Sequence, residues 1–322
     1  MNSLEHQLLD VNGITLGLYT AGPPAGRPLW LLHGFPECWH SWRQQIGPLA
    51  AAGYRVLIPE MRGYGKSSAP RDPAAYDLIT VCGDIQAAMD LLGHSEACMV
   101  GHDWGAPIAW HLALLEPLRV KAVAGMAVPF GGRPRQPAIE MMRQHYTGRF
   151  HYILHFQQPG VAEQEMDADI PRTLRMMMHN TSAAVPKDFF LQEKPAGAGL
   201  FDGMQDPGIL PPWCDAEAFN HYLETFTGRG FHGALNWYRN FERNWQRTEA
   251  LANRHIEQPA LFLLGDKDPV GTLEAYTLQQ MPKRIANLEQ HLLSDCGHWI
   301  QNEQAAQVNR LLLAFLTRHY AA

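Results

Sequence analysis

Short apolar runs alternate along this chain with stretches of helix length, and no other feature of the sequence constrains the fold as strongly. The runs cover residues 29–32, 55–58, 97–100, 120–126, 260–264 and 288–293. Continuous apolar runs of this length are typical of strands that are buried on both faces. Helix-length stretches at 79–92 and 106–116 separate some of them. The alternation therefore predicts an α/β fold, with a mostly parallel sheet covered by helices on both faces.

The alternation stops between residues 131 and 245, where Met, His and aromatic residues recur at helical spacing without a clear strand. Gly131, Gly132 and Pro134 mark the start of this region, and Pro and Gly cluster again in a long loop over residues 195–212. We predict an α/β core of residues 1–130 and 246–322, interrupted by a helical cap domain of residues 131–245. Ligands of open α/β sheets bind beyond the carboxyl ends of the strands, where such a cap would cover them and exclude water.

Charge and cysteine usage exclude several classes of function. The chain has 32 acidic and 26 basic residues, which gives no reason to expect nucleic acid or an anionic membrane surface as a partner. No apolar run is long enough to span a bilayer. The five cysteines are scattered without metal-ligand spacing, and no H-E-x-x-H motif occurs. We expect a cytoplasmic protein, monomeric or homodimeric, that acts on a small molecule without a metal or other cofactor.

The apolar run at 97–100 leads into a Gly-x-nucleophile-x-Gly turn, residues 101–105, that has aspartate where hydrolases usually have serine. Asp103 is the residue that this turn presents to a pocket. A carboxylate, with a reference pKa of about 3.9, is ionised at neutral pH and needs no base to activate it. Its attack on an acyl carbon would give a reactive anhydride, whereas attack on a saturated carbon gives a stable alkyl ester. Epoxides and organohalides are therefore the favoured substrates.

An acid and a histidine follow Asp103 along the chain, each after an expected strand. They are Asp268 and His298, and nucleophile, acid and histidine in this order are typical of α/β-hydrolases. His298 would activate the water that hydrolyses the ester, while Asp268 orients its ring. Asp266 is the near alternative for the acid, and Asp295 is a weaker one. Considered singly, each residue also fits a structural role: Asp103 that of a helix cap, Asp268 that of a turn residue and His298 that of an ordinary loop histidine.

Backbone N–H groups must stabilise the oxyanion that develops on Asp103 during ester hydrolysis. The loop His33, Gly34, Phe35 and Pro36 follows the first long apolar run and offers the Phe35 N–H. The Trp104 N–H would be the second donor. Considered alone, this loop is equally consistent with a simple tight turn.

The segments HGFPE, GHDWGA, the Asp268 loop and CGHW resemble the α/β-hydrolase-fold epoxide hydrolases, close to the soluble mammalian, plant and bacterial enzymes. In the cap, HYILHFQQPGVAE resembles the family segment that carries one catalytic tyrosine, which falls on Tyr152. NWYRN resembles the second such segment and implies a role for Tyr238. The resemblance also implies a cis peptide before Pro36. The sequence departs from the family at His155 and Cys38.

Opening an epoxide expels an alkoxide, which leaves only when an acid donates a proton to it. A tyrosine, with a reference pKa of about 10, stays protonated and can donate. Spacing alone also fits a core role for both tyrosines, as it does for methionines 141, 142, 176, 177 and 178. A dehalogenase of the same fold, holding halide with Trp104, is the main rival. Some dehalogenases have their acid after the preceding strand, but residues 127–130 contain no carboxylate. A non-catalytic ligand-binding protein is the third alternative.

Overall fold

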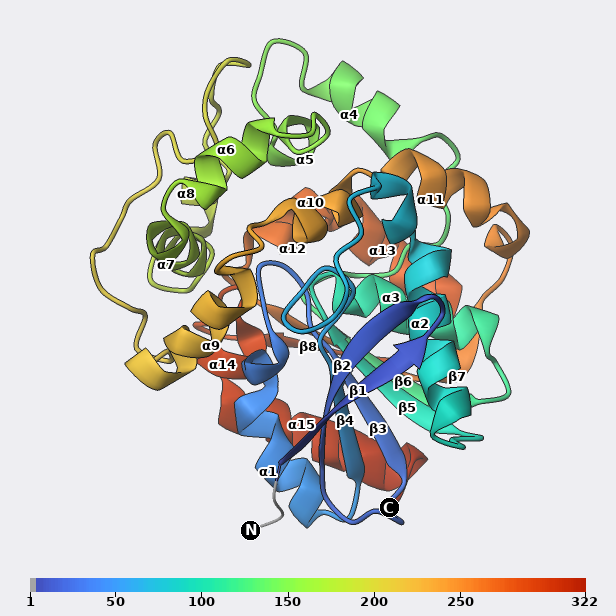
Figure 1. Ribbon diagram of the computed structural model, residues 1–322. Helices are drawn as coiled ribbons and strands as arrows, with labels where there is room; N and C mark the ends of the chain where they lie inside the picture. The colour runs from blue at the N-terminus through green and yellow to red at the C-terminus, as the bar shows by residue number, and fades with distance from the viewer. Residues whose placement is uncertain (1–3) are drawn as a thin grey trace.

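A computed structural model describes residues 4–322, which form one eight-stranded sheet with helices around it (Figure 1). The strands are β1 (Glu5–Val11), β2 (Ile14–Ala21), β3 (Pro28–Leu32), β4 (Arg55–Pro59), β5 (Ala97–His102), β6 (Val120–Met126), β7 (Ile256–Gly265) and β8 (Ile285–Leu293). Their order across the sheet is β1-β2-β4-β3-β5-β6-β7-β8. The pairs from β4 through β8 are parallel, whereas β1–β2 and β2–β4 are antiparallel. The predicted mostly parallel sheet is thus confirmed.

The antiparallel hairpin of β1 and β2 was not predicted from the sequence, because β1 is not a continuous apolar run. In β1, exposed and buried side chains are mixed, because this strand lies at the edge of the sheet. Asn12 and Gly13 connect the two strands with φ of 46° and 76°. A two-residue turn with positive φ at both positions matches the twist of a hairpin, and Asn-Gly is its strongest sequence signal.

Two hydrophobic layers enclose the sheet. Helices α1 (Arg43–Ala51) and α15 (Ala305–His319) pack on one face, and α2 (Leu78–Leu91) and α3 (Gly105–Leu115) pack on the other (Figure 1). Successive side chains of β3 alternate between the layers: Leu29 and Leu31 join one cluster and Trp30 the other. This alternation follows from the strand period of two and explains why a strand buried on both faces is apolar throughout.

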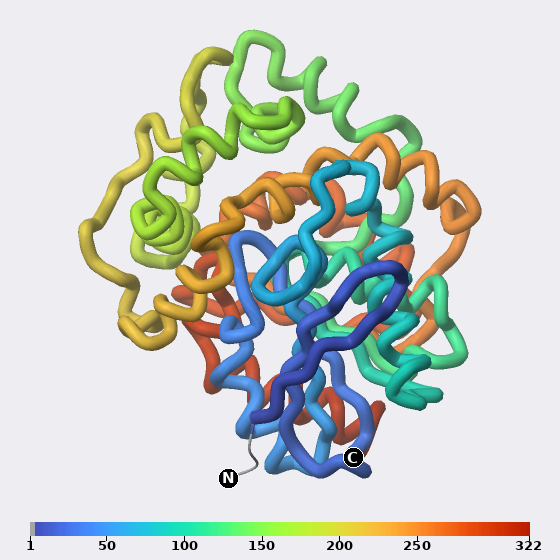
Figure 2. The backbone as a smooth tube through the Cα atoms, viewed as in Figure 1, coloured from blue at the N-terminus to red at the C-terminus, as the bar shows by residue number. Residues whose placement is uncertain are grey.

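The eight α-helices between β6 and β7, which we call the cap helices, occupy one end of the molecule (Figures 1 and 2). They are α4 (Ala138–His145), α5 (Tyr152–His155), α6 (Val161–Asp167), α7 (Ile170–Asn180), α8 (Lys187–Phe190), α9 (Ala216–Phe226), α10 (His232–Tyr238) and α11 (Phe241–Arg247). Apart from one isolated bridge between Arg149 and Pro195, residues 131–255 contain no strand pairing. The predicted helical region is present, while the domain boundaries at 130 and 246 stay a prediction.

Short helices complete the connections between these elements. They are η1 (Trp39–Trp42), η2 (Pro73–Tyr76), η3 (Glu249–Leu251), α12 (Pro269–Leu273), α13 (Ala275–Arg284) and α14 (Ile300–Glu303). Within residues 4–322, none of the helices has the length and apolar character that crossing a bilayer requires.

Candidate active site

Asp103 lies in a sharp turn between the end of β5 and the start of α3. Its φ is 49°, a left-handed conformation that costs free energy for any residue other than glycine. The bend is possible because Gly101 and Gly105 have no side chains: a Cβ on Gly101 would overlap the Gly105 carbonyl, and one on Gly105 would overlap that of Leu32. The predicted geometry of the turn is therefore present, and Asp103 lines a cavity with 9% of its surface exposed.

The loop after β3 lies directly against this turn. The Phe35 N–H donates a hydrogen bond to Asp103 Oδ1 at 2.7 Å. His33 supports the loop, since its Nε2 accepts from the Met61 N–H at 3.0 Å and its Nδ1 lies 3.1 Å from the Gly34 carbonyl. The Phe35–Pro36 peptide is cis, as the resemblance implied. Trp104 follows Asp103 at the start of α3, so both expected N–H donors belong to segments at the carboxylate.

His298 lies between two carboxylates. Its Nδ1 is 3.1 Å from Asp268 Oδ2, and its Nε2 is 3.6 Å from Asp103 Oδ2. Asp268 also caps α12 by accepting from the Val270 N–H at 2.9 Å, so its capping role and its contact with His298 coexist. The two alternative acids have other partners, because Asp266 accepts from the Cys296 N–H and Asp295 pairs with Lys267.

The charges at this cluster depend on each other. Burial by itself raises the pKa of Asp103, but the hydrogen bond and positive charge of His298 outweigh it and hold that pKa below its ordinary value. Burial lowers the pKa of His298, and the negative charges of Asp268 and Asp103 raise it well above the ordinary value. The positive form of His298 and the negative form of Asp103 therefore stabilise each other.

Tyr152 and Tyr238 lie in the cap helices and line the same cavity. Their ring centroids are 6.1 Å apart, and burial together with the charge of Asp103 raises the pKa of both phenols. Both side chains are therefore neutral and able to donate. Gln157 connects the two helices, since its Nε2 donates to the carbonyls of Ile153 and Tyr238 at 2.8 Å each.

The cavity between the cap helices and the sheet is narrow, about 40 Å³, and mostly apolar. Its lining consists of Phe35, Asp103, Tyr152, Phe156, Met177, Thr181, Phe190, Leu200, Tyr238, Pro269, Val270, Leu273, His298 and Trp299. Of the methionines considered from the sequence, Met177 lines it, and Met176 and Met178 are core residues. His155 and Cys38, the two departures from the family, do not contribute to this lining; His155 pairs with Glu165 at 2.7 Å.

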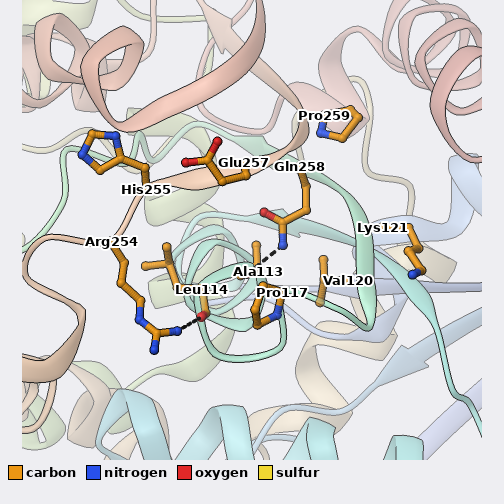
Figure 3. A pocket seen from close by; sticks show the side chains of 10 residues that line it. All are labelled: Ala113, Leu114, Pro117, Val120, Lys121, Arg254, His255, Glu257, Gln258 and Pro259. Carbon is orange, nitrogen blue, oxygen red and sulfur yellow. Dashed lines mark hydrogen bonds between the residues drawn. The ribbon is translucent and has the colours of Figure 1, made fainter.

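A larger hollow of about 400 Å³ lies at the other end of the sheet, near the amino ends of β6 and β7 (Figure 3). Arg254 and Gln258 in its wall donate to the Leu114 and Ala113 carbonyls. Its wall includes none of the residues expected to be catalytic. The charged cluster of Asp103, Asp268 and His298 therefore lies at the smaller of these two cavities. Among residues 4–322, no group of three or more His, Cys, Asp or Glu side chains is placed to hold a metal.

A buried network that was not predicted from the sequence lies beneath Asp103. His102 Nδ1 is 2.6 Å from Glu37 Oε1, and His102 Nε2 lies 2.8 Å from the His298 carbonyl. Glu37 also accepts from the N–H of Gly34 and from Gln301 Nε2. Burial by itself raises the pKa of Glu37, but the electrostatic interaction and hydrogen bond with the His102 ring outweigh burial and hold that pKa below its ordinary value. The network thus joins the Phe35 loop, the Asp103 turn and the His298 segment.

Comparison with known proteins first gives the class: residues 27–305 match the family model described as alpha/beta hydrolase fold. Epoxide hydrolase A of Mycobacterium tuberculosis is 40% identical over 320 residues, which cover 98% of each chain. The bifunctional epoxide hydrolase 2 of Sus scrofa is 39% identical over 91% of this chain and 52% of its own length.

Solved structures agree with the sequence relatives. Epoxide hydrolase A from Mycobacterium thermoresistibile superposes with a TM-score of 0.93 at 40% identity, covering 99% of this chain and 100% of its own. An epoxide hydrolase from an endophytic Streptomyces gives a TM-score of 0.92 at 37% identity, covering 97% and 95%. The chain belongs to the epoxide hydrolases of the α/β-hydrolase fold.

Proposed function

We propose that this enzyme converts an epoxide and water into a vicinal diol through a covalent alkyl ester on Asp103. The observation that carries the proposal is the position of the Asp103 carboxylate. The Phe35 N–H holds its Oδ1, its Oδ2 faces His298, and two neutral phenols line the cavity that it enters. Oδ2 is accordingly the attacking atom.

Attack of Asp103 on one epoxide carbon forms a C–O bond, and the bond from that carbon to the epoxide oxygen breaks. The electron pair moves to this oxygen, to which Tyr152 and Tyr238 donate hydrogen bonds and a proton. Their raised pKa values suit this task, because a phenol that is ionised in the resting enzyme has no proton to give. The proton that His298 releases can replace the one that the phenol loses.

Esterification removes the negative charge of Asp103, which is one of the causes that raise the pKa of His298. The pKa of His298 therefore falls once the ester has formed, and the neutral ring becomes a base. It takes a proton from water, and the hydroxide attacks the ester carbonyl. The Phe35 and Trp104 N–H groups stabilise the oxyanion. Collapse breaks the bond between the ester carbonyl carbon and the diol oxygen, and this oxygen takes the proton of the added hydroxyl. The diol leaves, Asp103 is again a carboxylate, and His298 keeps the proton that it took from water.

Two phenols at the nucleophile favour an epoxide over a haloalkane, since a departing halide needs only weak donors. We propose a small apolar epoxide as the substrate, because the lining outside the charged cluster and the phenols is aromatic and aliphatic, with Thr181 as the exception. We also propose that the enzyme acts in the cytoplasm as a monomer or homodimer. The free thiols of all five cysteines support a reducing compartment.

Isotope labelling tests the proposed mechanism. A single turnover of excess enzyme with an aryl epoxide in ¹⁸O-water should give unlabelled diol, because the first oxygen comes from Asp103, and label should remain in the peptide that contains Asp103. Labelled diol in that first turnover would contradict the covalent mechanism. A haloalkane assayed in parallel should release no halide, and halide release without diol formation from the epoxide would favour the dehalogenase alternative.

A further inference from the structure

The carboxylate of Glu303, at the end of α14, accepts three backbone hydrogen bonds around the catalytic histidine. Its Oε1 accepts from the Trp299 N–H at 2.9 Å, and its Oε2 accepts from the Gly297 N–H at 3.1 Å. These two donors precede and follow His298 in the chain. Glu303 therefore fixes the backbone on both sides of the residue that must reach Asp103.

The third donor to Glu303 comes from the cap region. The Ala183 N–H, in the segment after α7, donates to Glu303 Oε2 at 2.8 Å. The same segment contacts His298 itself, whose N–H donates to the Thr181 carbonyl at 2.9 Å. Gly297 permits this approach, because a Cβ there would overlap the backbone of Ser182 and Ala183. One carboxylate thus joins the cap region to the histidine segment.

Contact with solvent alone does not explain why the Glu303 carboxylate accepts three backbone hydrogen bonds. Burial raises the pKa of Glu303, although its backbone hydrogen bonds partly offset the effect. Glu303 is half-buried, so its carboxylate gives up part of its hydration, and three N–H donors match the acceptor-only character of an ionised carboxylate. An amide at this position has one acceptor oxygen and an NH₂ group that would face other donors.

We propose that Glu303 is a positioning residue, which holds His298 in place for ester hydrolysis and makes this placement depend on the docked cap segment at Ala183. The inference rests on the proposed function, in which Asp103 alone attacks the epoxide and His298 is needed as a base only in the second step. Loss of the Glu303 carboxylate should therefore slow hydrolysis of the ester much more than its formation.

The test compares Glu303→Gln with the wild-type enzyme in single-turnover and steady-state kinetics. The rate of ester hydrolysis should fall about 10-fold to 100-fold, the range expected when a hydrogen bond to a charged group is lost. Ester formation should stay within about twofold. Because the ester then accumulates, kcat and KM should fall together, with little change in kcat/KM. Glu303→Asp keeps the charge and should recover part of the hydrolysis rate.

Asp77→Asn is the matched control. Asp77 is a buried carboxylate that joins the core to α11 through Arg243 and Arg247, without contacting the His298 segment. Its loss should lower thermal stability and leave the ratio of the two rates unchanged. A folded Glu303→Gln enzyme that slows both steps equally, or neither, overturns the inference, as does a Glu303→Asp enzyme that hydrolyses the ester no faster than Glu303→Gln. Absence of an ester on the wild-type enzyme in intact-mass measurements would instead refute the proposed function.

Discussion

Replacing the two cavity tyrosines by phenylalanine should block ring opening while sparing the hydrolysis of an ester already formed. The rings of Tyr152 and Tyr238 would keep their packing, since Tyr238 contacts Phe35 and Phe156 with centroids 5.2 and 5.0 Å apart. Only the hydroxyl groups are lost. A hydrogen bond to a charged group contributes about 1.5–3 kcal/mol, so each hydroxyl should account for about 10-fold to 150-fold in alkylation rate.

The double variant Tyr152→Phe/Tyr238→Phe should therefore form the ester about 10² to 10⁴ times more slowly, if the two donors contribute independently. Stopped-flow tryptophan fluorescence can follow the reaction, because the Trp104 ring lies 5.1 Å from Tyr238, and intact-mass measurements count the ester. Tyr222→Phe is the control: its hydroxyl is buried against Ser41, outside the cavity lining. Alkylation by the double variant at the wild-type rate would refute the assignment of the tyrosines.

Three further predictions concern the charged cluster and the turn. Asp103→Asn should form no alkyl ester. The substitution should also lower the pKa of His298, because the negative charge of Asp103 raises that pKa in the wild-type enzyme. An unchanged His298 pKa in an NMR titration would contradict the ion pair. His298→Gln should accumulate about one equivalent of ester with negligible turnover, and multiple turnovers by this variant would argue against the role of His298 as base. In the wild-type enzyme, ester hydrolysis should accelerate as the pH rises through the pKa that His298 has in the ester intermediate. Gly101→Ala should lower the free energy of unfolding by about 3 kcal/mol, since the new Cβ overlaps the Gly105 carbonyl, whereas Gly47→Ala, which meets nothing within 4 Å, should not; urea denaturation compares the two.

The parallel part of the sheet was predictable, because a strand that is buried on both faces is a continuous apolar run in the sequence. The run at 97–100, for example, is apolar at every position, because β5 has helices on both faces. The β1–β2 hairpin lacks such a run, because its outer strand is partly exposed. The sequence signal of this hairpin is Asn12-Gly13, since both residues of its turn have positive φ.

The proximity of Asp103, Asp268 and His298 was predictable for a related reason. Each residue follows a strand, and the carboxyl ends of parallel strands meet at one edge of the sheet. The contacts of Glu37 with His102 and Gln301, and of Glu303 with Ala183, were not predictable, since they depend on which loops meet in the folded chain. Glu303 and Ala183, for instance, are 120 residues apart.

The position of the cap helices between β6 and β7 has an evolutionary consequence. These two strands remain direct neighbours, with Val123 opposite Ala260 and Met126 opposite Leu263, so the whole helical region is one lengthened crossover between adjacent strands. Additions and deletions there need not shift any strand register. Selection can therefore vary the size and shape of the cavity while the relative positions of Asp103, Asp268 and His298 are kept.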